Sequence, residues 1–174
     1  MDNKQFTFRR YIESDADAIY EAYAKYAWSN IQPYFSGPCV VREKTEFLDK
    51  FQKFSQNHYR PPIVANAENR PCGVYHISYS RANRYNELTM HLWSDTHLAK
   101  AVLKEAIDLA LGKEIPNQYV LVEVPGYAPE LKQAADDLGL DLVGMVPNYL
   151  RHDDELHHKY IYVISFEKWH SAKD

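Results

Sequence analysis

Residues 119–140 read YVLVEVPGYAPELKQAADDLGL, and they combine a strand pattern with a helix pattern. Residues 119–124 form a nearly unbroken β-branched and apolar run, which is typical of a strand covered on both faces, as the central strands of parallel sheets are. Pro129 stands where a first helical residue would, and Gly139 can end the helix. The stretch therefore predicts a strand and a helix at the point where a sheet becomes parallel. The apolar stripe of the helix consists of Leu131, Ala134, Ala135 and Leu138.

Further elements are expected on both sides of this stretch. Upstream, an apolar stripe between residues 98 and 110 predicts a helix that Ser94 or Asp95 can cap and that Gly112 ends. Downstream, residues 140–148 and 160–166 predict two more strands. The amino-terminal half adds a strand at 6–11, a helix capped by Ser14, a helix from Thr45, and strands at 63–67, 73–80 and 87–93.

These elements predict an α/β (α+β) fold with a central mixed, mostly antiparallel sheet of about seven strands flanked by about four helices. The chain has 174 residues, close to the usual size of one domain, and no linker or low-complexity segment interrupts it. Its 45% hydrophobic and 25% charged residues are typical of a folded globular protein. We expect a single domain over residues 1–174.

Composition also excludes several classes of partner. The chain carries 20 Lys and Arg against 24 Asp and Glu, without the basic block that nucleic-acid binders present to phosphates. Its two cysteines, Cys39 and Cys72, make neither a disulfide framework nor a zinc-ligand set, which favours a reducing, cytoplasmic setting. The amino terminus enters a strand pattern directly, without an apolar segment long enough for a signal peptide or a membrane span. We therefore expect neither nucleic acid nor a membrane among its partners.

Three stretches, taken with the order of elements, resemble one known family. FTFRRYIESDADAIYEAY (6–23) looks like its opening strand and helix, and IVANAENRPCGVYHISYS (63–80) looks like its hairpin, with Gly73 at a recurrent strand glycine. APELKQAADDLGL (128–140) keeps the helix length and closing Leu-Gly of a family segment. The family is the GCN5-related N-acetyltransferases (GNAT), in particular the branch that acts on ribosomal-protein N-termini. The resemblance spans nearly the whole chain and implies a GNAT-like acyltransferase that uses acetyl-CoA.

The segment that would hold acetyl-CoA departs from the family pattern. In the family, a glycine-rich loop follows the fourth strand, and its backbone N–H groups hold the coenzyme pyrophosphate at a helix N-terminus. Here residues 93–100 read WSDTHLAK, a degenerate motif without glycine, in which the carboxylate of Asp95 would repel a pyrophosphate. Lys100 and His97 can offset that charge in part. The resemblance places the coenzyme at Leu92, Trp93, Ser94, His97, Leu98, Ala99, Lys100 and Ala128.

The implied reaction needs a base that takes a proton from the amine. Glu87 lies where some family members carry a glutamate base, and the period-two alternation of a strand puts His91 on the same face. Glu87 and His91 are therefore the base candidates. The alternative is structural, with Glu87 a solvated strand-end residue and His91 a satisfied histidine of the sheet.

The reaction also needs an acid that protonates the departing thiolate. Ala135 stands where the family often has a tyrosine in this role, so Tyr127 and Tyr149 are the nearby substitutes that the sequence offers. An irregular segment at 28–41 is interrupted by prolines and glycine and is rich in aromatic residues. We expect it to bind the acceptor through Trp28, Tyr34 and Phe35.

Residues 151–158 read RHDDELHH and contain several side chains of the kind that ligate metals. They bridge the last two expected strands, where a polar, solvated turn is expected, and no second cluster has the spacing to complete a site. We therefore expect a turn here and no metal.

Two functions remain open. The first, preferred on the resemblance, is an N-acetyltransferase that transfers an acetyl group from acetyl-CoA to an amine of a small molecule or a protein or peptide terminus. The second is a non-catalytic binding or regulatory protein of the same fold that has lost acetyl-CoA binding, and the missing glycines favour it. An open helix N-terminus at 93–100 would support the enzyme, whereas occlusion by Asp95 or Trp93 would support the alternative. The sequence allows a homodimer and does not name the acceptor.

Overall fold

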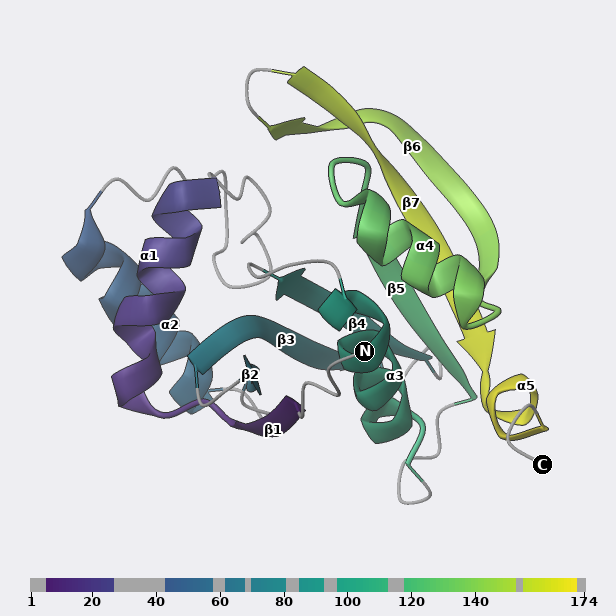
Figure 1. The fold of residues 1–174 in the computed structure, drawn as a ribbon, viewed down its shortest axis with the longest axis horizontal. Coiled ribbons are helices and arrows are strands. Elements are labelled where there is room, and N and C mark those ends of the chain that lie inside the picture. The colour runs from purple at the N-terminus through teal and green to yellow at the C-terminus, as the bar shows by residue number, and fades with distance from the viewer. Residues whose placement is uncertain are drawn as a thin grey trace. The chain divides into compact units, whose positions relative to one another are not determined.

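The computed structural model describes residues 6–26, 43–57, 62–67, 70–80, 85–92, 97–112, 118–152 and 155–171. Seven strands form one sheet in the order β1-β2-β3-β4-β5-β7-β6 (Figure 1). The elements are β1 (Phe6–Arg10), a 3-10 turn (Glu13–Asp15), α1 (Ala16–Tyr26), α2 (Lys44–Asn57), β2 (Ile63–Ala67), β3 (Arg70–Ser80), β4 (Tyr85–Leu92), α3 (His97–Ala110), β5 (Tyr119–Pro125), α4 (Pro129–Asp137), β6 (Asp141–His152), β7 (Glu155–Ser165) and α5 (Phe166–Ser171).

The sheet is mixed, as the sequence predicts. β1 pairs with β2, β2 with β3, and β5 with β7, all antiparallel, whereas β4 and β5 pair in parallel. The parallel pairing runs from Tyr85 beside Tyr119 to Leu88 beside Val122. The stretch at 119–124 therefore does mark the point where the sheet becomes parallel. Among the described helices, none is long and apolar enough to cross a membrane.

The chain divides into two compact units, and the first contains the amino-terminal elements up to His76. Its core is aromatic. The rings of Phe47 and Phe51, both on α2, stack at 5.8 Å, and Tyr11 meets Phe51 edge-on at 4.9 Å. Tyr20 of α1 lies 5.4 Å from Phe47. Phe47 and Phe51 are almost completely buried, so this face of α2 lies in the core.

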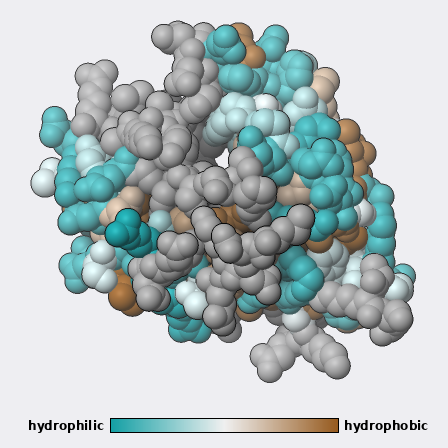
Figure 2. Space-filling view, in the orientation of Figure 1, coloured by the Kyte–Doolittle hydropathy of each residue, from teal (hydrophilic) through white to brown (hydrophobic). Residues whose placement is uncertain are grey.

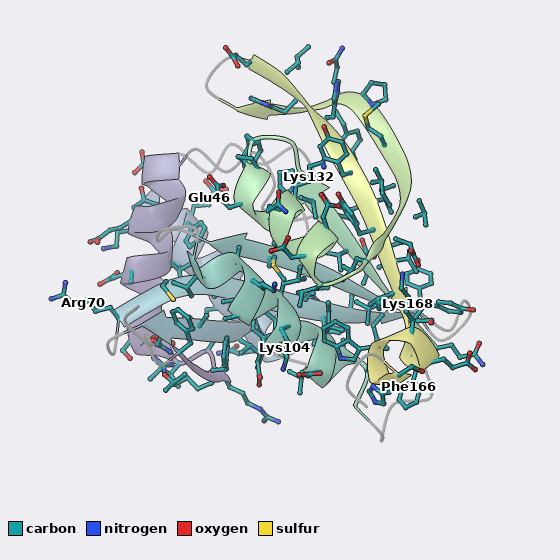
Figure 3. The ribbon with its side chains drawn as sticks, turned by 45° about the vertical axis from the view of Figure 1, so that its right-hand side comes forward. Glu46, Arg70, Lys104, Lys132, Phe166 and Lys168 are labelled. Atoms are coloured by element: carbon teal, nitrogen blue, oxygen red, sulfur yellow. The ribbon has the colours of Figure 1, made fainter. Side chains whose placement is uncertain are left out.

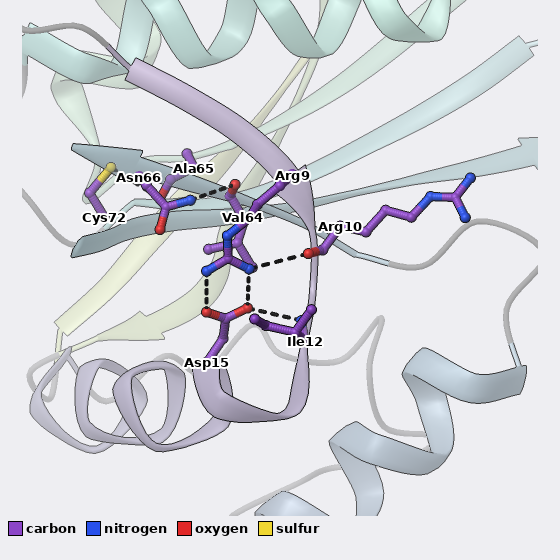
Figure 4. Close-up of polar contacts among 8 residues, drawn as sticks. All are labelled: Arg9, Arg10, Ile12, Asp15, Val64, Ala65, Asn66 and Cys72. Carbon is purple, nitrogen blue, oxygen red and sulfur yellow. Dashed lines mark hydrogen bonds and ion pairs between the residues drawn. The ribbon is translucent and has the colours of Figure 1, made fainter. Parts of the chain in front are cut away.

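The start of α1 is held by a carboxylate that the sequence analysis did not single out. Asp15 accepts two hydrogen bonds from the guanidinium of Arg9, at 2.7 and 2.6 Å, and a third from the backbone N–H of Ile12 at 2.9 Å (Figure 4). The prediction that Ser14 caps this helix is wrong, because Ser14 lies inside the preceding 3-10 turn and is exposed. The longer reach of the Asp15 side chain lets it satisfy the free N–H one turn earlier.

The second unit contains α3, α4, β5, most of β6 and β7, and α5. Asn86 of β4 is fully buried and donates its side-chain amide to the carbonyl of Ala110, the last residue of α3, at 2.6 Å. The hydroxyl of Tyr162 on β7 donates to Asp136 of α4 at 2.8 Å. Lys132, labelled on α4 in Figure 3, completes this cluster with an ion pair to Asp136 at 3.2 Å. These bonds fix α3 and α4 over one face of the strands.

Two expectations for this unit are wrong. The strand at 119–124 is not covered on both faces: Val120, Val122 and Val124 are fully buried, but Leu121 and Glu123 on the other face are half-exposed. The polar stretch 151–158 is mostly strand, because β6 continues to His152 and β7 begins at Glu155. Cross-strand hydrogen bonding overrides the polar sequence in both strands. The short helix α5 was not expected either.

Candidate active site

The half-exposed face of the second unit gathers the charged side chains of three strands. Glu87 on β4 lies beside Leu121 on β5. Glu123 follows two residues later on β5 and therefore points to the same face. The antiparallel partner of Pro125 on β5 is Lys159 of β7, so Lys159 also shares this face. The surrounding side chains are apolar and half-exposed: Leu121, Ile161 and Val163.

Glu123 and Lys159 form an ion pair across these strands. The Nζ of Lys159 lies 2.7 Å from Oε1 of Glu123, and the Lys159 side chain is only 14% exposed. A charge this poorly hydrated depends on its partner, which distinguishes this pair from the exposed ion pairs on the helices. The pair fixes one carboxylate and one ammonium beside Glu87.

Among the described side chains of this cluster, two carboxylates share one ammonium, and that ammonium pairs with Glu123 and not with Glu87. Burial raises the pKa of the Glu87 carboxyl above its ordinary value, the negative charge of Glu123 raises it further, and the positive charge of Lys159 opposes both. A carboxylate whose pKa is raised toward neutrality is a better proton acceptor than a solvated one. The sequence-based candidate Glu87 thus occupies an environment suited to a base.

Tyr149, one of the two predicted acids, comes to the same cluster. The Nζ of Lys159 lies over its ring at 4.1 Å from the centroid. This contact holds the ring through a cation–π interaction, while the side chain as a whole stays about half-exposed. The structure therefore joins Glu87 and Tyr149 through the neighbouring Glu123 and Lys159.

An irregularity in β6 accounts for the position of Tyr149. A Cβ built at Gly144 would lie 3.8 Å from Cβ of Ile161, so these two residues face each other. In a regular antiparallel ladder that register would put Tyr149 and Lys159 on opposite faces of the sheet. Asn148, directly before Tyr149, has a φ of 51° in the left-handed region. We infer that Asn148 interrupts the alternation of side chains between the two faces of the sheet and thereby turns Tyr149 toward Lys159.

Tyr127, the other predicted acid, lies in a different place. It follows the end of β5, and its ring meets that of His157 edge-on at 5.6 Å. The preceding Gly126 donates its N–H to the carbonyl of His158 at 2.8 Å. A Cβ at Gly126 would come within 2.8 Å of that same oxygen, so the close approach of the two backbones requires glycine here.

The whole fold is shared with solved acetyltransferases. The spermidine/spermine N-acetyltransferase SpeG of Vibrio cholerae, in mutant forms, matches with a TM-score of 0.79 over 98% of this chain and 99% of its own, at 12% identity. A dodecameric spermidine N-acetyltransferase of the same bacterium matches with 0.78 over 98% and 99%, at 13% identity. An N-acetyltransferase of Staphylococcus aureus matches with 0.69 over 93% and 99%, at 15% identity. By sequence, no family model and no curated protein matches.

This chain has the fold of the GCN5-related N-acetyltransferases. The fold predicted from the sequence is thereby confirmed. Sequence identities this low define the acetyltransferase fold alone, so roles of individual residues have to be argued from the geometry of this chain. The resemblance to the branch acting on ribosomal-protein N-termini stays a prediction.

Part of the predicted coenzyme segment of the acetyltransferase fold is described. Leu98 and Ala99 are buried, so their side chains belong to the core. Lys100 is about half-exposed and forms a long, 3.4 Å ion pair with Asp137 of α4. The first turn of α3 carries no acidic residue, and its N–H groups are of the kind that bind phosphate. Ala128, before α4, is half-buried. Binding of a pyrophosphate by Ala128 and by the first turn of α3 stays a prediction.

Other predicted residues lie outside what the structure describes. Trp93, Ser94 and Asp95 fall in an undescribed segment, so the test between an open and an occluded helix N-terminus stays a prediction. The aromatic residues Trp28, Tyr34 and Phe35 are also undescribed. For His91, Leu92 and His97 the backbone is described, at the end of β4 and the start of α3, but the side chains are not.

Sequence reasoning missed Glu123 and Lys159. Glu123 is the one charged residue in the apolar run 119–124, a signal that could have marked it as a residue of the exposed face. Lys159 gives no such signal, because its position depends on β7 pairing with β5, a contact between distant parts of the chain. In the described ranges, no three His, Cys, Asp or Glu side chains come together as a metal site would need.

Proposed function

We propose that this protein is an N-acetyltransferase that uses acetyl-CoA, with Glu87 as its base. The single observation that carries the proposal is the half-buried Glu87 carboxyl beside the Glu123–Lys159 ion pair. The acetyltransferase fold supports it, since solved structures with which this chain shares that fold include N-acetyltransferases. Acetyl-CoA would supply the activated acyl group as a thioester.

In the proposed reaction Glu87 accepts a proton from the ammonium form of the acceptor. The freed amine attacks the thioester carbonyl, so that a C–N bond forms and the C–S bond breaks. Tyr149 donates its phenolic proton to the thiolate that leaves. Lys159, whose ammonium lies over the Tyr149 ring, would stabilise the phenolate that results. As the amide forms, the nitrogen loses its second proton, which restores the phenol of Tyr149, and Glu87 releases its proton to solvent, so that one proton is released in each turnover.

The acceptor is proposed to be a small cationic amine. Two carboxylates against one ammonium leave the cluster with a net negative charge, which attracts a protonated amine. The apolar side chains around it, Leu121 and Ile161 among them, would contact the carbon chain of such a molecule. SpeG, named for spermidine and spermine, makes polyamines the first acceptors to test.

The proposal is tested first by calorimetric titration with acetyl-CoA. Binding in the micromolar range, about −8 kcal/mol, is expected if the α3 N-terminus holds the pyrophosphate. A panel of amines is then incubated with acetyl-CoA, and free thiol and acetylated product are measured. Turnover of one or more amines supports the enzyme, and no heat together with no turnover rejects it.

The role of Glu87 is tested by Glu87→Gln, which keeps the shape and removes the charge. We expect the rate of acetyl transfer to fall at least about tenfold while the far-UV spectrum is unchanged. The matched control is Glu105→Gln on the exposed side of α3, which should keep the wild-type rate. Equal rates for Glu87→Gln and wild type would remove Glu87 from the mechanism.

A second function is favoured by one specific observation, the absence of glycine from residues 93–100. In that reading the protein keeps the fold, binds no acetyl-CoA and uses the charged cluster for another cationic ligand. Calorimetry separates the two readings, because spermidine would then bind to a protein that gives no signal with acetyl-CoA. A cytoplasmic location and self-association, for which a dodecameric structure of the same fold is a precedent, belong to either reading.

A further inference from the structure

A side chain of β7 contacts the backbone directly before Tyr149. The N–H of Asn148 on β6 donates a hydrogen bond to Nδ1 of His158 at 3.2 Å. In a regular ladder a backbone N–H donates to a backbone carbonyl of the neighbouring strand, so an imidazole acceptor marks a departure from the ladder. Asn148 is also the residue with the left-handed φ of 51°. The unusual acceptor and the unusual backbone conformation therefore coincide at one residue.

His158 itself is held on two sides. Its carbonyl accepts the N–H of Gly126, directly after β5, at 2.8 Å. Its ring meets the ring of Tyr160, two residues further along β7, edge-on with 6.3 Å between the centroids. The first contact fixes the backbone of His158, and the second restricts its ring. Nδ1 is therefore an acceptor with a defined position.

The bond to His158 determines how the chain continues. It fixes the orientation of the peptide group between Pro147 and Asn148, because that group carries the donating N–H. The left-handed φ of Asn148 then sets the direction of the chain into Tyr149. Such a conformation persists where contacts around it hold it, although asparagine tolerates it better than most residues do. His158 supplies a contact of this kind.

The His158 bond lies at the surface of the protein. Asn148 and Tyr149 are exposed, and Figure 2 shows teal, hydrophilic residues beside brown, hydrophobic ones along the right-hand side, where Figure 1 draws β6. An exposed N–H that loses its acceptor can bond to water, so the loss costs little stability. Removal of the His158 side chain is therefore expected to change the position of Tyr149 and to leave the protein folded.

The bond also depends on the protonation of the imidazole. Nδ1 accepts a hydrogen bond only in the neutral tautomer that carries its hydrogen on Nε2, and a protonated ring donates from both nitrogens. His158 shares its face of β7 with Tyr160, and Nζ of Lys132 on α4 lies 5.5 Å from the centroid of that tyrosine ring. Lys132 in turn is paired with Asp136. Protonation of His158 is thus expected to release the N–H of Asn148.

We propose that His158 is a positioning residue for Tyr149. Its Nδ1 holds Asn148 in the left-handed conformation, and this conformation brings the Tyr149 ring to the ammonium of Lys159, 4.1 Å from the ring centroid. His158 acts through the backbone of Asn148 and not on the reacting atoms. The catalytic consequence rests on the proposed function, in which Tyr149 protonates the leaving thiolate, whereas the positioning itself is independent of that function.

The positioning is tested by nuclear magnetic resonance, without substrate or coenzyme. The ring signals of His158 and Tyr149 and the backbone amide of Asn148 are followed from about pH 8 to about pH 5, the range in which histidines titrate. We expect the Asn148 and Tyr149 signals to shift with the midpoint of the His158 ring. In His158→Asn, whose side-chain oxygen can stand in for Nδ1, the shifts with that midpoint should disappear. His157→Asn, on the other face of β7, is the matched control and should keep them.

The catalytic consequence is tested with His158→Leu, which removes the acceptor. We expect kcat for acetyl transfer to fall at least about tenfold with KM for acetyl-CoA nearly unchanged, and His158→Asn to retain most of the wild-type rate. In a Tyr149→Phe background, His158→Leu should have no further effect, because the residue that it positions is already disabled. A purely structural role would instead lower the rate by the same factor in both backgrounds.

Two results would overturn the proposal. One is an Asn148 amide whose signal does not follow the His158 ring in wild type, a measurement that needs no variant. The other is an equal loss of rate for His158→Leu with and without the Tyr149 hydroxyl. A protein that transfers no acetyl group to any amine rejects the proposed function, while the wild-type titration still decides whether His158 positions Tyr149.

Discussion

Replacing Asp15 by alanine tests the account of how α1 is anchored. The carboxylate is 4% exposed and accepts three hydrogen bonds, two from Arg9 and one from the N–H of Ile12. Its removal leaves the Ile12 N–H without its acceptor and Arg9 without its counter-charge. Both groups need water or another partner in the variant.

The magnitude follows from how exposed each group is. Loss of the capping bond costs typically about 1 kcal/mol. A buried charge-assisted pair costs ~3–5 kcal/mol to break, but the Arg9 side chain is 40% exposed and can turn toward water, which reduces that figure. We therefore expect Asp15→Ala to lower the free energy of unfolding by ~2–4 kcal/mol. Asp15→Asn keeps an acceptor for Ile12 and should lose about half of this.

Asp17→Ala is the matched control, because Asp17 lies two residues away and also forms an ion pair. Its partner is Lys44 at 2.9 Å, with the two side chains 67% and 45% exposed. An exposed pair of this kind contributes at most about 1 kcal/mol. Urea titrations followed by circular dichroism measure both variants, with an unchanged slope as the check on two-state behaviour. Equal losses for Asp15→Ala and Asp17→Ala would refute the reasoning.

Three further predictions concern the second unit. Gly126→Ala should lower thermal stability by ~1–3 kcal/mol because its Cβ meets backbone at 2.8 Å, whereas Gly144→Ala, with 3.7 Å to a side chain, should be neutral. Because the folded-state pKa of Glu87 is raised, its contribution to stability is present below the ordinary value of 4.5 and is lost as the pH rises through the raised pKa. The free energy of unfolding of Glu87→Gln, measured by urea titration, should therefore increase relative to that of wild type between pH 4 and pH 8. A difference between the two proteins that does not change with pH would contradict this. Lys159→Met should move the acidic limb of the pH–rate profile to higher pH, since Lys159 opposes the pKa rise, and Lys159→Arg should leave it in place.

Local patterns in the sequence predict most of the fold. The strand at 63–67 coincides with β2, and the apolar run at 119–124 coincides with β5 except for its last residue. Both predictions rest on local features of the sequence, namely the alternation of apolar and polar residues or a run of β-branched residues. The same local reasoning wrongly predicts a polar turn at 151–158, because the strands there are stabilised by pairing across the sheet and not by their own sequence.

The candidate site is predictable only in part. Glu87 is found because it stands at the start of a recognisable strand, and Tyr149 because it is one of the few tyrosines near the expected acid. Lys159 and Glu123 are not found from the sequence, because their contact depends on β7 pairing with β5. The left-handed backbone at Asn148 is equally invisible in the sequence, although asparagine tolerates it better than most residues do.

Asn86 has a consequence for where the chemistry can take place. Its side chain is sealed beneath α3 and bonded to Ala110, while the next residue, Glu87, points the opposite way. If β4 slipped by one position, the carboxylate would enter the apolar interior and the amide would lose its acceptor. Burying the carboxylate and losing the hydrogen bond of the amide both cost free energy, so only one register of β4 in the sheet is favourable. The buried Asn86 thus fixes the register of β4, and this register determines the face of the sheet to which the proposed base Glu87 points.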